Sequence, residues 1–128
     1  MRFPMPNFPC EFELPDEWWA EAGMDGFRPS APAYTPNGPA ELVALREIEP
    51  PSRFPEHPKD WRGFDRVRLI SVLKGIAAGA EIEPVPLRQL PEEAFPDFAP
   101  YRFRVRNGVH RFYASIAAGF GHLPAVIA

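Results

Sequence analysis

The chain has 128 residues, of which 18 are proline, 45% are hydrophobic and 24% are charged, with a formal net charge of -3. Average usage gives roughly six prolines in a chain of this length, so proline is in about threefold excess. The length suits one domain with one core and excludes disorder throughout. We expect a cytoplasmic protein without a membrane partner, because no run approaches the ~18 apolar residues of a spanning helix and the start lacks a signal-peptide stretch.

Charge and cysteine content narrow the classes of ligand and chemistry. Residues 1–60 carry a charge balance of -6 and residues 61–128 a balance of +3, so the second half is expected to meet an anion. A balance of +3 is small beside the basic surfaces that hold duplex DNA, and we do not expect nucleic acid as a partner. Cys10 is the only cysteine, which excludes an internal disulfide and a Cys-rich zinc site.

The first forty residues hold much of the proline excess, and we interpret residues 1–40 as an N-terminal arm. Prolines near the start favour an extended path. Residues 14–23 predict a short helix, with proline and acids in its first turn and glycine as its stop. This helix is too short for Trp18 and Trp19 both to face one core. One of them is therefore expected to cap the domain or to line a groove, with an ordinary packing role favoured over a ligand role.

Residues 41–128 predict a second unit, a small α+β domain with a mixed sheet and a few helices. The expected elements are a strand over 41–48, a helix over 64–79, strands over 83–88 and 101–106, a helix over 110–120 and a strand over 123–128. The first helix has Asp65 at its start, Gly79 at its end and Val67 on its apolar face. Residues 101–106 alternate between apolar side chains and arginine, which is typical of a half-buried strand.

The turn between the 101–106 strand and the 110–120 helix carries the most suggestive chemistry. Asn107-Gly108 forms the turn, and the free N–H groups and positive dipole at a helix start favour an anion. His110 and Arg111 add donors there, and arginine can hold phosphate in a bidentate fork. His110 is our candidate catalytic residue, because a histidine can transfer protons near neutral pH. The alternative is an ordinary Asn-Gly turn followed by a solvent-facing His-Arg pair.

In its order of elements and in these motifs, the second half of the chain resembles the ParB/sulfiredoxin superfamily. The motifs that carry the resemblance lie at residues 48–53, 64–76, 82–87, 104–115 and 123–127. The resemblance covers roughly residues 42–128 and implies the fold of that superfamily. It also implies that the turn binds nucleotide phosphates, with ATP or CTP and Mg²⁺ as the ligands. The implied ligand-binding residues are Asn107, Gly108, Val109, His110, Arg111 and, from the first motif, Arg53.

The chain departs from two branches of this superfamily at the turn. Val109 stands where sulfiredoxin has its catalytic cysteine, so we do not expect thiol phosphorylation unless Cys10 reaches the site. Val109, His110 and Arg111 stand where the partition proteins have a glutamate and two arginines. Only one arginine remains, and CTP hydrolysis of that kind does not follow from the resemblance.

Three functions remain open. The first is a nucleotide- or phosphate-binding domain, with or without weak phosphotransfer or NTP hydrolysis through His110. The second is a non-enzymatic interaction module, in which the proline-rich arm and an exposed Trp18 or Trp19 dock a protein partner. The third is a ParB-like nuclease that uses the arginines of residues 101–106. We expect no structural metal site, because neither His57 nor His122 has a second His, Cys or acidic residue at ligand spacing.

Overall fold

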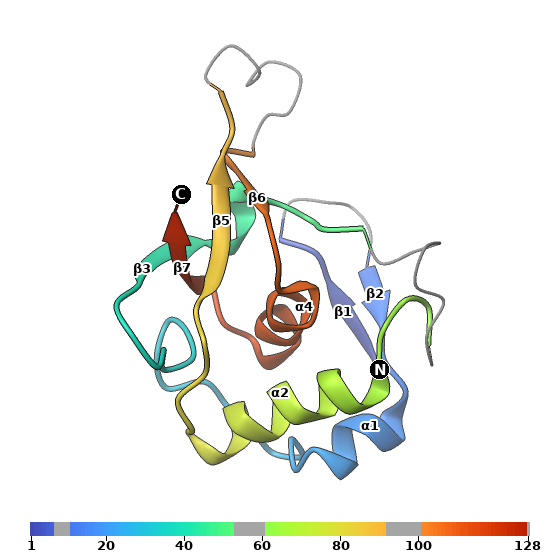
Figure 1. The fold of residues 1–128 in the computed structure, drawn as a ribbon. Coiled ribbons are helices and arrows are strands. Elements are labelled where there is room, and N and C mark those ends of the chain that lie inside the picture. Colours follow the sequence, from blue (N-terminus) through green and yellow to red (C-terminus); the bar gives the residue numbers. More distant parts are fainter. Residues whose placement is uncertain (7–10, 53–60, 92–100, 128) are drawn as a thin grey trace.

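The computed structural model describes residues 1–6, 11–52, 61–91 and 101–127, which form a small α+β fold (Figure 1). None of the helices within these ranges is long and apolar enough to cross a membrane. The elements, in chain order, are β1 (Arg2–Pro4), β2 (Glu11–Glu13), α1 (Asp16–Glu21), β3 (Glu41–Ala44), a 3₁₀ turn (Leu45–Glu47), β4 (Ile48–Glu49), α2 (Arg66–Ala78), β5 (Val85–Gln89), β6 (Phe103–Val105), α4 (Val109–Ala118) and β7 (His122–Ile127).

Five strands form one mixed sheet in the order β3-β7-β5-β6-β4, while β1 and β2 pair separately as an antiparallel pair. In the larger sheet β3 and β6 run antiparallel to β7 and β5, whereas β7 with β5 and β6 with β4 are parallel pairs. The strands β3 and β4 follow each other in the chain but lie at opposite edges. Three extended residues span at most ~10 Å, so the sheet must curl to bring its two edges near each other.

The predicted single strand over 41–48 is wrong, because the 3₁₀ turn breaks it into β3 and β4. On one side of the break, the Leu45 N–H donates to the carbonyl of Gly121, just before β7, at 3.0 Å. On the other side, Glu47 accepts a bond of 2.8 Å from the N–H of Arg102, just before β6. The 3₁₀ turn therefore connects the two edge strands of the curled sheet.

Helix α4 lies in the middle of the molecule (Figure 1) and is buried from Phe112 through Ala118. It contacts α2, β1 and β7. A helix buried on every side reads as continuously apolar, and the sequence Phe-Tyr-Ala-Ser-Ile-Ala-Ala has that character. The predicted helix over 110–120 is confirmed, although it ends at Ala118 and Phe120 is only partly buried.

Helix α2 has the predicted caps but not the whole predicted face. Asp65 caps its N-terminus by accepting a bond from the Arg68 N–H, and Gly79 ends it in the left-handed conformation. Val67, expected inside, is 72% exposed. The buried stripe consists of Leu69, Ile70, Leu73 and Ile76. A residue six positions before Leu73 lies roughly 120° around the helix from it, which explains why Val67 faces outward.

The alternation predicted for residues 101–106 is confirmed, with the arginines exposed and the side chains between them partly buried. One of these arginines, Arg104, pairs with Glu49 of the neighbouring strand β4 at 3.3 Å. The exposed face of β6 is thus partly neutralised by its own sheet.

Residues before position 41 contribute to the same hydrophobic core as those after it. Phe12 and Leu14 are 3% and 0% exposed, and the Phe12 ring contacts the ring of Tyr113 with centroids 5.1 Å apart. Trp18 and Trp19 are both buried and both belong to the core, so the favoured packing role is confirmed. The expectations that they cannot both face one core and that one of them stays exposed for a partner are wrong. Residue 41 therefore does not mark a division of the core.

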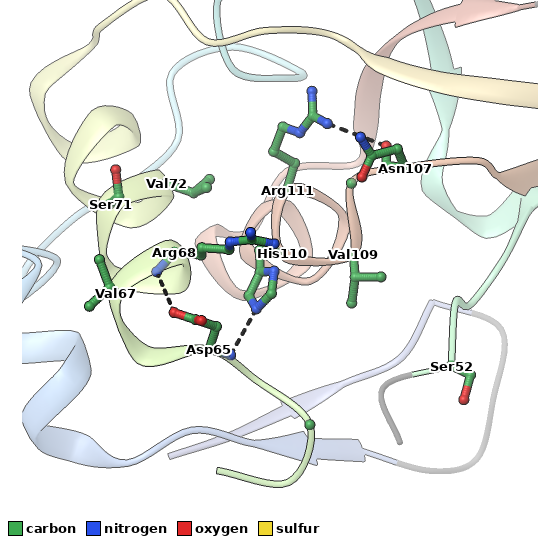
Figure 2. Close-up of a pocket in the computed structure, with 12 residues that line it drawn as sticks. Ser52, Asp65, Val67, Arg68, Ser71, Val72, Asn107, Val109, His110 and Arg111 are labelled. Carbon is green, nitrogen blue, oxygen red and sulfur yellow. Dashed lines mark hydrogen bonds between the residues drawn. The ribbon is translucent and has the colours of Figure 1, made fainter. Parts of the chain in front are cut away.

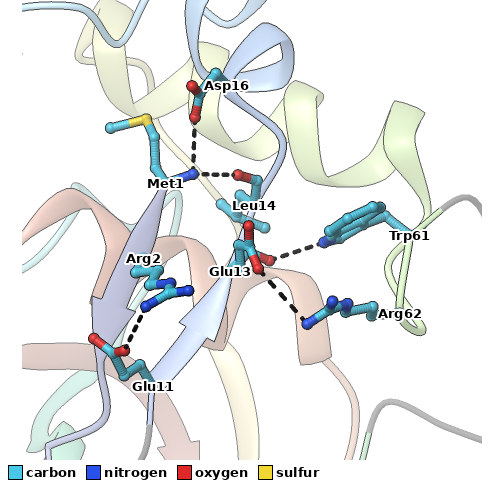
Figure 3. A network of polar contacts seen from close by, with 8 residues as sticks. All are labelled: Met1, Arg2, Glu11, Glu13, Leu14, Asp16, Trp61 and Arg62. Carbon is cyan, nitrogen blue, oxygen red and sulfur yellow. Dashed lines mark hydrogen bonds and ion pairs between the residues drawn. The ribbon is translucent and has the colours of Figure 1, made fainter.

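Polar contacts tie the β1–β2 pair to the segment before α2 (Figure 3). Trp61 Nε1 donates to the carbonyl of Glu13 at 3.0 Å, and Arg62 pairs with the Glu13 carboxylate at 3.7 Å. At the same end of the pair, where Arg2 is opposite Glu13, the Met1 amino group donates to the Leu14 carbonyl at 2.7 Å and contacts the Asp16 carboxylate at 2.8 Å. These bonds fix the short pair of strands against the two helices beside it.

Candidate functional site

A partly open pocket of about 650 Å³ lies between α2 and the start of α4 (Figure 2). Of the residues predicted to bind a ligand, Asn107, Gly108, Val109, His110 and Arg111 all line it. Arg53, predicted from the first motif, lies outside the described residues. The other lining residues are Ser52, Gly63, Asp65, Val67, Arg68, Ser71 and Val72.

Gly108 gives the turn its shape. Its φ of 130° and ψ of 36° lie in a region that L side chains rarely adopt. A Cβ at this position would also stand 3.0 Å from Cγ1 of Val85 and 3.1 Å from Nη2 of Arg111. Glycine therefore allows the chain to turn from β6 into α4 while packing closely on the buried Val85 of β5.

The backbone at the start of α4 offers donors to the pocket. The first bond of the helix runs from the Phe112 N–H to the Gly108 carbonyl at 3.0 Å, and no side chain caps this end. Within the described ranges, the N–H groups of Val109, His110 and Arg111 have no acceptor. Unpaired donors at the positive end of a helix dipole form a favourable place for an anion.

The Arg111 guanidinium is engaged by the protein itself. Nη1 donates to the carbonyls of Glu83 and Pro84 at 3.0 and 2.9 Å, and Nη2 donates to the carbonyl of Asn107 at 3.3 Å. Its side chain is only 13% exposed. These bonds hold the start of α4 against the segment that enters β5, and most of the guanidinium N–H groups are used in doing so.

His110 joins the starts of the two helices. Its Nε2 accepts a hydrogen bond of 2.9 Å from the backbone N–H of Asp65, the residue that caps α2 (Figure 2). A backbone N–H can only donate, so Nε2 carries no proton and the neutral ring holds its proton at Nδ1. Burial lowers the pKa of His110; the Asp65 carboxylate opposes this effect, and the Arg68 charge adds to it.

This hydrogen bond bears on the predicted catalytic role of His110. A general base needs a ring nitrogen with a free lone pair. In this arrangement Nε2 is already bonded to Asp65, and Nδ1 carries the proton. The structure thus places His110 where it was predicted, at the pocket, but uses its basic nitrogen to hold two helices together.

Arg68 and Ser71 form the polar part of the opposite wall. They lie three residues apart on α2, and residues at this spacing share one helix face. Figure 2 shows the Arg68 side chain directed towards His110 and the start of α4. Arg68 is exposed, and its guanidinium has no ion-pair or hydrogen-bond partner within the described ranges. Arg68 directly follows Val67, which was predicted to face the core. Placing Val67 on the outer face of the helix would have indicated this wall of the pocket.

The remaining candidate groups fall elsewhere. Cys10 and His57 lie outside the described residues. His122 begins β7, and its Nδ1 is buried without a hydrogen-bond partner in the part of the chain that the structure describes. Within that part, no three His, Cys, Asp or Glu side chains are grouped so that they could hold a metal ion.

No model of a known protein family matches the chain, and no curated protein matches it significantly.

Proposed function

We propose that the protein binds a small phosphate-bearing ligand, of the nucleotide class, in the pocket between α2 and α4. The observation that carries the proposal is the group of three unpartnered backbone N–H groups, from Val109 to Arg111, that begins α4 beside this pocket. The resemblance of residues 104–115 to the ParB/sulfiredoxin superfamily supports the same ligand class. A superfamily fold of that kind is part of this proposal.

Arg68 supplies the side-chain cation of the site. The N–H groups of the α4 turn and the Arg111 bonds are fixed by the backbone, whereas Arg68 extends from α2 across the pocket. In this proposal a phosphate sits on the α4 start, and Arg68 reaches it from the side in a charge-assisted hydrogen bond. Ser71, on the same face of α2, adds a hydroxyl to that wall.

The rest of the pocket suits the uncharged part of such a ligand. Val67, Val72 and Val109 give the lining an apolar portion, and Val67 is 72% exposed. The volume of about 650 Å³ falls within the ~300–1,000 Å³ of typical small-molecule sites. A phosphate joined to a flat or apolar group would use both parts of the pocket.

The arrangement favours binding over turnover. His110 holds the Asp65 N–H with the nitrogen that a base would use. Asp65 is the only carboxylate among the described lining residues, and it caps α2. We therefore propose that Mg²⁺, when ATP or CTP is the ligand, is held mainly by the phosphates, and that phosphotransfer or hydrolysis is at most weak.

Isothermal titration calorimetry tests the proposal. Inorganic phosphate, ADP, ATP and CTP are titrated separately, with and without Mg²⁺, into the full chain. We expect saturable binding that weakens about tenfold in Arg68→Ala, since a hydrogen bond to a charged group contributes roughly 1.5–3 kcal/mol and about 1.4 kcal/mol equals tenfold. Lys74→Ala removes the same charge from α2 outside the pocket and should leave binding unchanged. Absence of binding by the unmodified protein at millimolar concentrations would refute the proposal.

A further inference from the structure

We propose that His110 is a proton-sensitive positioning residue: its neutral ring clasps α2 to α4, and its protonation releases the clasp and weakens anion binding in the pocket. This inference rests on the proposed function for the anion, while the clasp itself rests on contacts within the protein. The decisive contact joins residues 45 positions apart, from the Asp65 N–H to His110 Nε2 at 2.9 Å.

The clasp sits where the two walls of the pocket meet. His110 belongs to the first turn of α4, which lines the pocket, and Asp65 stands directly before α2, which carries Arg68 and Ser71. The bond between these two helix starts therefore contributes to the spacing between the first turn of α4 and the Arg68 wall. The Phe64 ring, 6.0 Å from the imidazole between centroids, packs beside it and is fully buried.

Protonation is incompatible with the clasp. The imidazolium ring has two N–H donors and no acceptor, so its Nε2–H would point at the Asp65 N–H. The new charge would also lie at the positive end of the α4 dipole and near Arg68, which disfavours it further.

The Asp65 carboxylate is the nearby group that favours the protonated ring. To bond it, the imidazolium must leave the Asp65 N–H and turn to the carboxylate, whose Oδ1 accepts the Arg68 N–H at 3.1 Å as the cap of α2. The other charged group close by on α4, Arg111, is directed to the carbonyls of Glu83 and Pro84. Acid conditions thus replace the bond from the Asp65 N–H by an attraction to the Asp65 carboxylate.

The sign of the effect distinguishes this mechanism from simple attraction. An imidazolium that merely faced the pocket would attract an anion, and affinity would rise in acid. A clasp that opens in acid makes affinity fall instead. Burial lowers the pKa of His110 below its ordinary 6.5, so the fall is expected below pH 6.5, and the neutral ring persists at physiological pH.

Two measurements on the full chain test the inference. Nitrogen NMR of the unliganded protein should show neutral His110 with its proton at Nδ1, and the Asp65 amide signal should titrate with the His110 midpoint. Sulfate serves as the anion probe, because its charge is constant from pH 5 to 8 whereas phosphate esters titrate near pH 6. We expect the sulfate affinity to fall about tenfold between pH 7.5 and one unit below that midpoint.

Variants separate the clasp from general structural effects. In His110→Gln the amide oxygen can accept the Asp65 N–H without titrating, so sulfate binding should persist and lose its pH dependence. His110→Leu leaves the Asp65 N–H unpaired and should weaken binding at every pH. His122→Gln, the control at β7, should retain the pH dependence of the unmodified protein.

Two results would overturn the clasp: a neutral His110 with its proton on Nε2, or a sulfate affinity that rises in acid. Absence of sulfate, phosphate and nucleotide binding at every pH would instead refute the proposed function, and the NMR titration would still decide whether the clasp exists.

Discussion

Replacing Gly108 by alanine perturbs both the backbone of the α4 turn and the packing beneath it. The backbone there has φ 130°, outside the left-handed region that an alanine can enter at modest cost. The added Cβ would meet Val85 Cγ1 at 3.0 Å and Cγ2 at 3.2 Å. Val85 is 0% exposed in β5, between β7 and β6, so it has little room to move away.

The two effects can be estimated separately. A residue held in a sparsely populated backbone region costs about 1–3 kcal/mol. An extra methyl group forced into a packed core costs about 1–3 kcal/mol as well. Gly108→Ala should therefore lower the free energy of unfolding by about 4 kcal/mol. For a domain of this size that corresponds to a Tm lower by roughly 10–20 °C.

Urea and thermal unfolding followed by circular dichroism provide the assay, with two glycine controls. Gly79→Ala places an alanine at a left-handed φ of 68°, with nothing within 4 Å of the new Cβ. It should lower the free energy of unfolding by about 1 kcal/mol. Gly121→Ala adds a Cβ in open space at a backbone without positive φ, and should be close to neutral. A Gly108→Ala variant no less stable than Gly79→Ala would refute the close-packing argument.

Three further predictions concern other parts of the fold. Deletion of residues 1–40 removes buried core side chains, including Leu14 and Met24, so the shortened chain should aggregate. Size-exclusion chromatography measures this, and a soluble, cooperatively folding product would contradict the prediction. Arg62 has φ 44°, so Arg62→Gly should relieve about 1 kcal/mol of backbone strain. The same change removes the contacts to Trp61 and Glu13, and the net change in the free energy of unfolding in urea should stay within about 1 kcal/mol of zero. A larger loss would show that those contacts outweigh the strain. Burial raises the pKa of Tyr34 to about 12, so the folded state keeps a proton that the unfolded state loses above pH 10, and stability should fall from pH 10 to 12; a Tyr34→Phe variant with the same slope would disprove the assignment.

Local patterns in the sequence predicted the local features of the structure. The caps of α2 at Asp65 and Gly79, the alternation over residues 101–106 and the glycine turn before α4 each depend on neighbouring residues, and each is present. The break at the 3₁₀ turn was not predictable in this way. Leu45 and Ile48 are both apolar, and their different partners, near β7 and in β6, are decided by the curl of the whole sheet.

The candidate site also combines features set by neighbouring residues with features set by residues that are distant in the chain. The backbone donors of α4 follow from the Asn-Gly turn and the helix after it, and the residues that carry them line the pocket. The wall made by Arg68 and Ser71 depends on how α2 is rotated, and the bond between His110 and Asp65 joins distant positions. Periodicity places residues on a helix face, but it does not say which face of another helix they meet.

The position of β7 in the sheet has a consequence for how the chain can be made. This strand lies between β3 and β5 and pairs with both, although β3 precedes it by about eighty residues. A nascent chain that has left the ribosome only as far as residue 120 has two strands without their common neighbour. Sheets closed by such distant pairings fold slowly. We therefore expect the sheet to close only after β7 has emerged, and until then the apolar face of α4 has to be shielded by the N-terminal strands, by α2 or by a chaperone.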